Sequence, residues 1–310
     1  MERNHRAGIT ALCKTLEISE NNFFLAKAQI DRVYVERKDY KGKSGKVRDL
    51  CYPLLSSMLY RVQSLIKERV LEKLDLLPEV RGYRKGSHNI NAAALMCGHK
   101  FMGKVDISKF HPSINRHHCE VALHEHGLSP SWSREIAQIA VYKGCLPQGA
   151  PTSNHIANLV MDSLLRRFVA RFAARRNVQF CNFGDDIAFF GSNESAVQVC
   201  LKAAKKALRY LGFRTNDKCR DSEHQGARRE FIGCATGRGR PDYPRESYRA
   251  FRKELRTNIQ SERTRNGHGP ITTSLHLTSL RHRIAYVARL NPRKARKLLD
   301  LFHRLCQARR

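Results

Sequence analysis

The feature that most constrains this chain is a pair of adjacent carboxylates, Asp185 and Asp186, set between two apolar runs. Residues 178–190 read as two strands joined by a tight turn, and Gly184 permits the backbone conformation that a hairpin tip requires. Two neighbouring anions repel each other, so a divalent cation is the expected partner, and magnesium prefers carboxylate and phosphate oxygens. The alternative is a plain turn, because glycine and aspartate are common turn residues.

A third carboxylate, Asp106, ends another apolar stretch at residues 101–106, which predicts a second strand with an acid at its end. Two strands that deliver carboxylates to one edge of a sheet can hold two metal ions. Such a pair of ions activates an attacking 3′ oxygen and stabilises a leaving pyrophosphate during nucleotidyl transfer. The combination of this strand with the hairpin favours a metal site over a plain turn.

A further segment, Leu-Pro-Gln-Gly-Ala-Pro-Thr-Ser at residues 146–153, lies between these two in the chain and precedes a predicted long helix. Together with Asp106 and the Phe-Gly-Asp-Asp sequence at 183–186, it resembles motifs A, B and C of reverse transcriptases in order and spacing. Followed by Asn158 and Leu159, it is similar to the retron and group II intron branch of that family. The resemblance extends over roughly residues 40–302.

The resemblance implies roles for individual residues. Its metal residues are Asp106, Ile107, Asp185 and Asp186, and its further catalytic residue is Lys218, which can protonate the leaving pyrophosphate. Its nucleotide-binding residues are Lys46, Arg48, Phe110, His111, Gln148 and Gly149. Its nucleic-acid-binding residues are Arg81, Arg84, Lys85, Phe231, Gly233, Arg293, Lys294, Arg296 and Lys297. The alternatives are an ordinary exposed lysine at position 218 and a basic surface turn at 81–86.

One position departs from the usual pattern of the family. Reverse transcriptases place an aromatic residue five positions after the aspartate of motif A, where its ring excludes a 2′-hydroxyl on the incoming sugar. Here that position is His111, directly after Phe110. An imidazole can fill the same space, or its ring nitrogens can hydrogen-bond a 2′-hydroxyl and weaken the selection for deoxynucleotides. The sequence leaves both outcomes open.

The overall charge indicates a polyanionic partner. Lys and Arg number 57 against 28 Asp and Glu, which gives a formal net charge of +29 and a pI near 10.2. No uninterrupted apolar run approaches the ~18 residues that span a bilayer, so we expect nucleic acid and not a membrane. The ten cysteines show no zinc-type spacing, and we expect reduced thiols in a cytoplasmic protein.

The order of predicted elements is α/β (α+β) with an all-helical C-terminal part. We expect a right-hand polymerase, with fingers and palm around a small antiparallel sheet at residues 1–235 and a helical thumb at 236–310. The boundary is placed at the Gly-, Arg- and Pro-rich stretch 236–246. Periodicity predicts a helix capped by Thr152 or Ser153 that runs to about residue 176. It predicts further helices at 55–76, 117–126, 131–142, 195–211, 246–260, 273–290 and 292–308.

The resemblance implies an RNA-directed DNA polymerase that uses two Mg²⁺ ions, or Mn²⁺ in their place. Its substrates are deoxynucleoside triphosphates, and its partners are an RNA template and primer, the RNA–DNA hybrid and a dedicated structured noncoding RNA. A retron-like phage-defence system would add an effector protein. Rival functions are an RNA-dependent RNA polymerase, whose motif C is usually Gly-Asp-Asp, a template-independent nucleotidyltransferase, and a catalytically idle RNA-binding scaffold.

Overall fold

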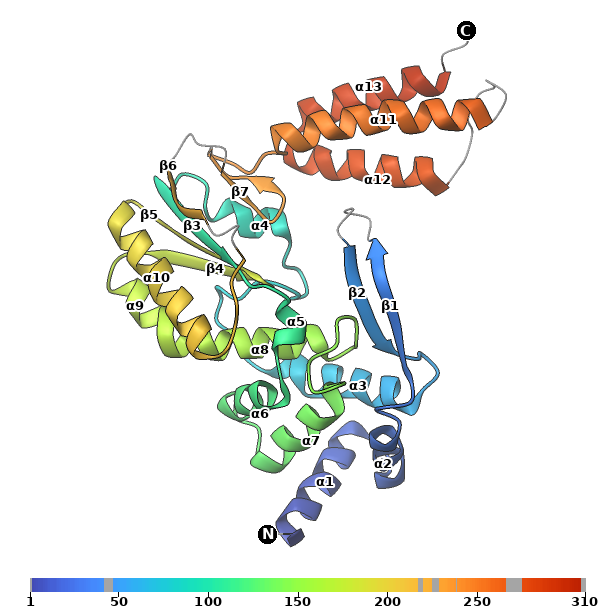
Figure 1. Cartoon of the computed structure of the whole chain (residues 1–310), viewed down its shortest axis with the longest axis vertical. Coiled ribbons are helices and arrows are strands. Elements are labelled where there is room, and N and C mark those ends of the chain that lie inside the picture. The colour runs from blue at the N-terminus through green and yellow to red at the C-terminus, as the bar shows by residue number, and fades with distance from the viewer. Residues whose placement is uncertain are drawn as a thin grey trace. The chain divides into compact units, whose positions relative to one another are not determined.

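The structure is a computed structural model that describes residues 2–41, 47–216, 220–224, 229–237, 239–265 and 275–307. The chain divides into two compact units. Unit 1 comprises Met1–Ser87 and Lys100–Glu223, and unit 2 comprises His88–His99 and His224–Arg310. Figure 1 labels the elements of both units.

Unit 1 is built on a sheet of four strands in the order β4-β5-β3-β6. These strands are β3 (Phe101–Asp106), β4 (Gln179–Phe183), β5 (Asp186–Gly191) and β6 (Arg220–His224). Strand β5 runs antiparallel to β3 and to β4, so the predicted hairpin and the predicted strand at 101–106 are confirmed. The ladder between β3 and β5 extends from Phe101 opposite Gly191 to Asp106 opposite Asp186.

The two faces of this sheet have different environments. Successive side chains of a strand point to opposite faces, so Asp106 and Asp186 share one face, and Val105, Ile187 and Phe189 share the other. The second set belongs to the main hydrophobic cluster of unit 1. Helix α10 (Glu194–Tyr210) contributes to the same cluster through Val197, Cys200, Leu201, Ala204 and Leu208. Helix α10 therefore covers the face that points away from the carboxylates.

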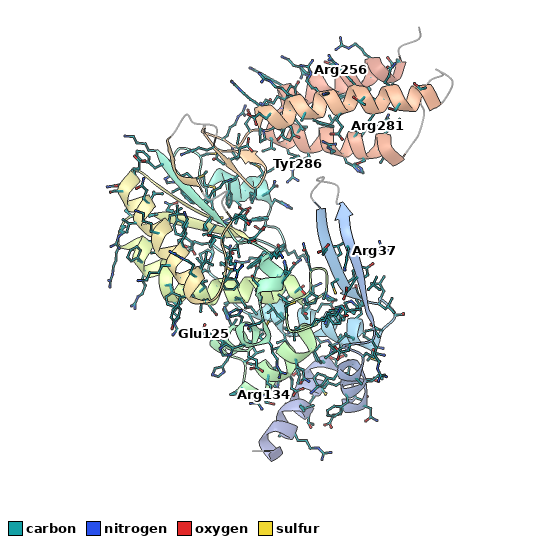
Figure 2. All side chains as sticks on the ribbon, viewed as in Figure 1. Arg37, Glu125, Arg134, Arg256, Arg281 and Tyr286 are labelled. Carbon is teal, nitrogen blue, oxygen red and sulfur yellow. The ribbon has the colours of Figure 1, made fainter. Side chains whose placement is uncertain are left out.

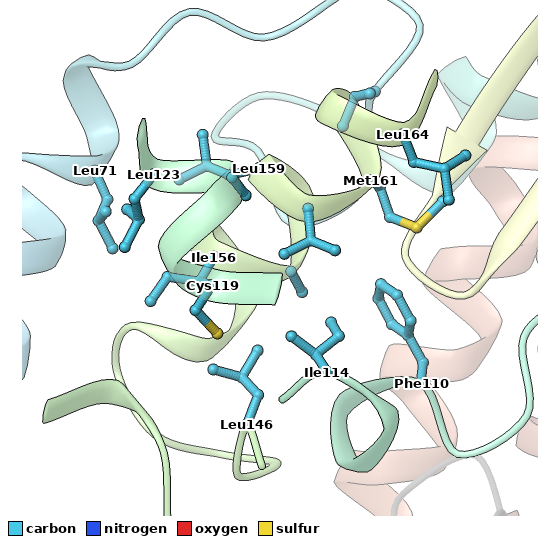
Figure 3. Packing of buried hydrophobic residues seen from close by; sticks show 14 of the residues in the cluster. Leu71, Phe110, Ile114, Cys119, Leu123, Leu146, Ile156, Leu159, Met161 and Leu164 are labelled. Atoms are coloured by element: carbon cyan, nitrogen blue, oxygen red, sulfur yellow. The ribbon is translucent and has the colours of Figure 1, made fainter. Parts of the chain in front are cut away.

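The remaining helices of unit 1 share this hydrophobic cluster. They are α1 (Glu2–Leu16), α2 (Glu20–Ala28), α3 (Met58–Arg69), α5 (Phe110–Ser113), α6 (Arg116–Glu125), α7 (Pro130–Ala140) and the continuous run α8 (Ser153–Leu165), η2 (Arg166–Ala170) and α9 (Arg171–Ala174). Strands β1 (Tyr34–Lys41) and β2 (Val47–Pro53) form a separate antiparallel pair. Figure 3 shows part of the cluster, in which Ile114 and Leu146 lie near Cys119 of α6 and Ile156 of α8.

Most predicted helices are confirmed within a few residues at their ends, but two differ. Ser57 accepts a hydrogen bond from the Tyr60 amide, so α3 begins at Met58, and it ends before a short 3-10 turn, η1 (Leu71–Lys73). The helix predicted to run to about residue 176 contains the π-helical turn η2. Thr152 occupies its N-cap, but the Thr152 side chain makes no capping hydrogen bond.

Unit 2 contains three long helices, α11 (Arg245–Arg265), α12 (Leu275–Leu290) and α13 (Pro292–Gln307), as the sequence predicts. Their apolar faces form one cluster that includes Phe251, Leu280 and Phe302. Arg256 and Arg281 are exposed on these helices (Figure 2). Unit 2 also contains α4 (Asn89–Ala94) and a short hairpin of β7 (Glu230–Phe231) and β8 (Cys234–Ala235).

The boundary between the units differs from the one expected at residues 235 and 236. The Asn89 side chain donates hydrogen bonds to the Ile232 carbonyl at 3.1 Å and to the Tyr286 hydroxyl at 2.6 Å. The fully buried Arg229 guanidinium donates to the carbonyl oxygens of Met96, His99 and Thr236. These hydrogen bonds join the α4 segment and the β7–β8 hairpin to the helices of unit 2.

Within the described segments, none of the helices combines the length and the apolar character needed to cross a membrane. The cysteines of the same segments carry free thiols.

Candidate active site

The turn between β4 and β5 carries Asp185 and Asp186 beside the end of β3. Asp106 lies opposite Asp186 in the ladder, and the Ile107 amide donates to the Asp185 carbonyl oxygen at 2.9 Å. All three aspartates are half-buried. The structure therefore brings these three predicted residues together at one edge of the sheet.

The buried side chain of Asn182 holds the shape of this turn. Its amide donates to the carbonyl oxygens of Gly184 at 2.9 Å and Asp186 at 3.2 Å. Gly184 has a φ of +65°, and a Cβ at this position would lie 2.9 Å from the Tyr83 hydroxyl oxygen. The backbone conformation favours glycine here, and a Cβ would also displace the Tyr83 hydroxyl. Sequence reasoning missed Asn182, whose only signal is a polar residue within an apolar strand.

Asp106 is positioned by the loop that follows α10. The Asn216 side chain donates to Asp106 Oδ2 at 3.1 Å, and the Asn216 backbone amide donates to the Asp106 carbonyl at 2.9 Å. The other carboxylate oxygen of Asp106, Oδ1, is buried and has no hydrogen-bond partner among the described groups. A buried carboxylate oxygen without a donor, beside two further aspartates, fits a bound cation.

The aspartates do not by themselves form a closed metal cage. In the part of the chain that the structure describes, no three acidic, histidine or cysteine side chains are arranged to hold an ion. Magnesium is usually held by one or two carboxylates together with substrate phosphates and water. The arrangement therefore fits a metal site that the nucleotide completes.

The segment that contains Arg81 lies against the turn between β4 and β5. The Arg81 amide donates to the Asn182 carbonyl at 2.9 Å, and the Asn158 side chain donates to the Gly82 carbonyl at 2.6 Å. A Cβ on Gly82 would lie only 2.3 Å from the Gly184 amide nitrogen. The two backbones can approach this closely because position 82 is glycine.

His111 lies beside this turn, and Phe110 does not. The His111 side chain is 6% exposed, its Nε2 lies 3.1 Å from Asn154 Oδ1, and its ring centroid lies 5.9 Å from that of Tyr83. Phe110, which the resemblance places among the nucleotide-binding residues, is packed in the main hydrophobic cluster next to Ile114 (Figure 3). Asn154 and Tyr83 are neighbours of His111 that sequence reasoning did not single out.

Gln148 and Gly149 are joined to strand β2. The Cys51 amide donates to the Gln148 carbonyl at 2.8 Å, and Gly149 has a φ of +124°. A Cβ on Gly149 would lie 3.5 Å from the Cys51 carbonyl oxygen. A backbone hydrogen bond thus fixes segment 146–149 to the β1–β2 pair. The same segment precedes α8 in the chain.

The structure describes only some of the other basic residues that are expected at the site. Lys46 and Lys218 lie outside the described residues, as does the side chain of Arg48, whose backbone belongs to β2. Arg84 and Lys85 are exposed, and the Arg84 guanidinium donates to two backbone carbonyls of its own segment.

In unit 2, Phe231 is fully buried, and Gly233, with a φ of +79°, is exposed in the β7–β8 turn. Three of the four basic residues predicted to bind nucleic acid on α13 are exposed, namely Arg293, Arg296 and Lys297. These three side chains present their cations to solvent, whereas the Phe231 side chain is packed inside unit 2.

Lys294 has a different environment from the one expected. Its ammonium group pairs with Asp242 Oδ2 at 2.9 Å and donates to the Tyr243 carbonyl at 2.5 Å. Burial acts to raise the pKa of Asp242, but hydrogen bonds from Lys294 and Asn291 outweigh it and hold that pKa below its usual range. Lys294 therefore anchors α13 to the segment before α11, whereas the other three basic residues are exposed.

The fold is similar to that of a viral RNA-dependent polymerase. The Sicinivirus 3Dpol RNA dependent RNA polymerase matches with a TM-score of 0.56 over 92% of this chain and 66% of that chain, at 11% identity. This likeness shows a right-hand polymerase fold. In sequence, the reverse transcriptase (RNA-dependent DNA polymerase) family matches residues 40–234. The chain belongs to the reverse transcriptase family.

Its relatives include retron enzymes. The retron Ec86 reverse transcriptase of Escherichia coli is 24% identical over 87% of this chain and 84% of that protein. The retron Mx65 reverse transcriptase of Myxococcus xanthus is 25% identical over 83% of this chain and 61% of that protein. The retron Mx162 reverse transcriptase of the same organism is 26% identical over 96% of this chain and 68% of that protein. The chain is thus distantly related to retron reverse transcriptases over most of its length.

Proposed function

We propose that this reverse transcriptase copies a structured noncoding RNA into DNA by nucleotidyl transfer at Asp106, Asp185 and Asp186. The observation that carries the proposal is the register of β3 and β5, which sets Asp106 opposite Asp186 with Asp185 in the same turn. Family membership supports the reaction class, and the exposed cations of α13 support a polyanionic template.

The two units take different parts in this proposal. The sheet and helices of unit 1 form the palm and fingers, and the segment 43–48 belongs to the fingers. Helices α11–α13 of unit 2 form the thumb. The support for this assignment is the right-hand polymerase fold together with the bundle of three helices that share one hydrophobic cluster.

Two Mg²⁺ ions, or Mn²⁺ in their place, would be held by Asp106, Asp185 and Asp186 together with phosphate oxygens. When bound, they supply charge stabilisation for the attacking 3′ oxygen and the leaving pyrophosphate. Asn216 holds one oxygen of Asp106 and leaves the other without a donor. Asn182 keeps the turn in the shape that sets Asp185 and Asp186 beside β3.

The setting of the reaction is inferred from the relatives. Because they are retron reverse transcriptases, we propose a retron-like phage-defence system with a dedicated noncoding RNA as template. The protein would bind the RNA primer and the RNA–DNA hybrid, use deoxynucleoside triphosphates, and act with an effector protein in the cytoplasm.

The metal carboxylates give the first test. Asp185→Asn should lower deoxynucleotide incorporation by roughly a hundredfold or more, because it removes a charge that stabilises the transition state. Incorporation is measured with magnesium on an RNA template annealed to a short primer. Asp31→Asn, which makes the same change at an exposed position of unit 1, is the matched control and should retain activity.

Circular dichroism and unfolding curves of both variants establish that the fold is kept. Near-normal incorporation by the Asp185→Asn protein would show that the reaction does not take place at these carboxylates.

A further inference from the structure

Helices α9 and α10 present a dense group of exposed cations on unit 1. They are Arg171 and Arg175 at α9, and Lys202, Lys206 and Arg209 on α10. The sequence has no acid between Asp162 and Asp185, and none between Glu194 and Asp217. Within the described part of the chain, the ion pairs of this region use Arg166 and Arg167 instead. A solvated helix face normally mixes charges of both signs, so this bias indicates a polyanionic partner.

The cations form two rows that lie side by side. Arg171 and Arg175 are four residues apart, as are Lys202 and Lys206, so each pair lines one face of its helix. At one end Phe168 of η2 packs edge-on against Tyr210, with ring centroids 6.1 Å apart. The two helices are neighbours in Figure 1 and pack against one another through η2.

The electrostatic effect of Arg176 at the other end indicates that the rows run in opposite directions. Burial raises the pKa of the Cys200 thiol, and the nearby Arg176 guanidinium partly offsets this effect. Arg176, at the end of α9, is therefore near the first half of α10, whereas Phe168 is near its last residue. We call these two antiparallel rows, together with Tyr210, the strip.

An exposed aromatic ring lies at one end of the strip. Tyr210 is 77% exposed, although Phe168 supports one edge of its ring. The Arg167 guanidinium lies 5.3 Å from the centroid of Phe168. A ring that is mostly exposed among cations gains little from packing but fits the stacking of a nucleobase whose phosphates are held nearby.

The strip is separate from the candidate active site. The apolar face of α10 packs on the sheet face formed by Val105, Ile187 and Phe189, and the cations of α10 are on its exposed side. Asp106 and Asp186 belong to the opposite face of the same sheet. Nucleic acid bound at the strip is therefore on the other side of the sheet from the carboxylates.

We propose that the strip formed by Arg171, Arg175, Lys202, Lys206, Arg209 and Tyr210 binds a single-stranded segment of RNA that is not being copied. The cations contact phosphates, and Tyr210 stacks on a base. An anionic bilayer fits less well, because most apolar residues of α10 are buried in the core, and the exposed Val199 and Tyr210 are 11 residues apart. The proposal concerns RNA binding and goes beyond nucleotidyl transfer. It does not depend on which residues catalyse that transfer.

Charge reversal tests the strip in the full chain. The active site is first saturated with a short RNA–DNA hybrid, and the affinity for a labelled single-stranded RNA is then measured by anisotropy at several salt concentrations. Arg171→Glu, Lys202→Glu and Lys206→Glu together should weaken binding at least about tenfold and lower the salt slope by about 2, since each phosphate contact contributes about 0.7. The matched control, Arg6→Glu, Lys14→Glu and Arg134→Glu, makes the same charge change on α1 and α7 and should have little effect.

Substitutions of Tyr210 test base stacking separately from charge. Tyr210→Ala should weaken binding of the single strand about tenfold, whereas Tyr210→Phe keeps the ring and should retain affinity. Unfolding temperatures of both variants control for the contact with Phe168. The inactive Asp185→Asn protein should still bind the single strand, which separates this proposal from that of the active site.

Four outcomes would overturn the proposal. The strip and control variants could weaken binding equally, which would show a general effect of net charge. The strip variant could bind RNA normally, or it could lose affinity only for anionic vesicles. Tyr210→Ala could leave binding of the single strand unchanged, which would exclude base stacking.

Discussion

His111 is the residue whose chemistry departs most from the pattern of the family. Its ring is buried, and its Nε2 lies 3.1 Å from Asn154 Oδ1. Tyr83 packs edge-on against it beside Gly184. An imidazole positioned by Asn154 and Tyr83 can pack beneath the incoming sugar. It is smaller than a phenyl ring, however, and carries polar nitrogens.

Substitutions of His111 should therefore change sugar selection. His111→Phe should raise the preference for deoxynucleotides over ribonucleotides, and His111→Ala should lower it, each tenfold being about 1.4 kcal/mol. The measurement is single-nucleotide extension with matched deoxy and ribo substrates. Asn154→Ala, which removes one polar neighbour of the ring and keeps the ring itself, should give a smaller change than His111→Ala. An unchanged ratio in both His111 variants would show that this residue does not contact the sugar.

Several residues of the site could be predicted from local pattern, and others could not. Asp106, Gly184, Asp185 and Asp186 stand out because acids and a glycine end apolar strands. The amide side chains that position these residues do not stand out in the sequence. Asn216, for example, contacts Asp106 across a separation of 110 residues. The same holds for the partner of Lys294, because its ion pair with Asp242 joins positions that are 52 residues apart.

At the scale of elements, Asp162 anchors α8 to its neighbours. Its fully buried carboxylate accepts hydrogen bonds from the Leu77 amide at 2.5 Å, from His126 Nε2 at 3.0 Å and from Arg166. Burial acts to raise the pKa of Asp162, but the hydrogen bonds from His126, Arg166 and Leu77 outweigh it and lower the pKa below its ordinary value. Helix α8 is thereby fixed beside the start of segment 77–84, which approaches the turn between β4 and β5.

The lowered pKa of Asp162 predicts how stability depends on pH. The ionised carboxylate stabilises the fold fully above its unfolded-state pKa of about 4, and this contribution is lost as pH falls through the lower folded-state pKa. Asp162→Asn should cost about 3 kcal/mol at pH 7, because it leaves buried donors without their anion. Urea unfolding of the variant and of the unaltered protein from pH 7 down to pH 3 should show the difference shrinking. Asp75→Asn, at an exposed position, should cost little, and an equal cost for both variants would contradict the assignment.

Substitutions on helix α13 should separate nucleic-acid binding from the stability of the fold. Arg293→Glu, Arg296→Glu and Lys297→Glu together should weaken binding of an RNA–DNA hybrid at least about tenfold and reduce its salt dependence. Lys294→Ala should instead lower the stability of unit 2, because it breaks the pair with Asp242. Filter binding at several salt concentrations and thermal unfolding distinguish the two effects. Unchanged hybrid affinity in the triple variant would remove α13 from the nucleic-acid surface.

At the scale of the whole molecule, the sequence indicates the order of strands and helices better than their grouping. The α/β arrangement follows from periodicity and motif order, and the predicted strand at 101–106 and the hairpin at 178–190 are confirmed. The set of elements that make up unit 2 cannot be predicted from these patterns. Helix α4 belongs to it through a hydrogen bond between Asn89 and Tyr286, which are 197 positions apart. Local patterns carry no information about such pairings, and the π-helical turn η2 likewise has no signal in the periodicity.

The central claim is that this chain synthesises DNA on an RNA template. The most direct measurement extends a primer on an RNA of mixed sequence with all four deoxynucleotides and magnesium, and then sequences the product. The account predicts DNA complementary to the RNA, absent when the template is omitted and absent with Asp185→Asn protein. A product that does not follow the template, or one that forms only from ribonucleotides, would contradict it.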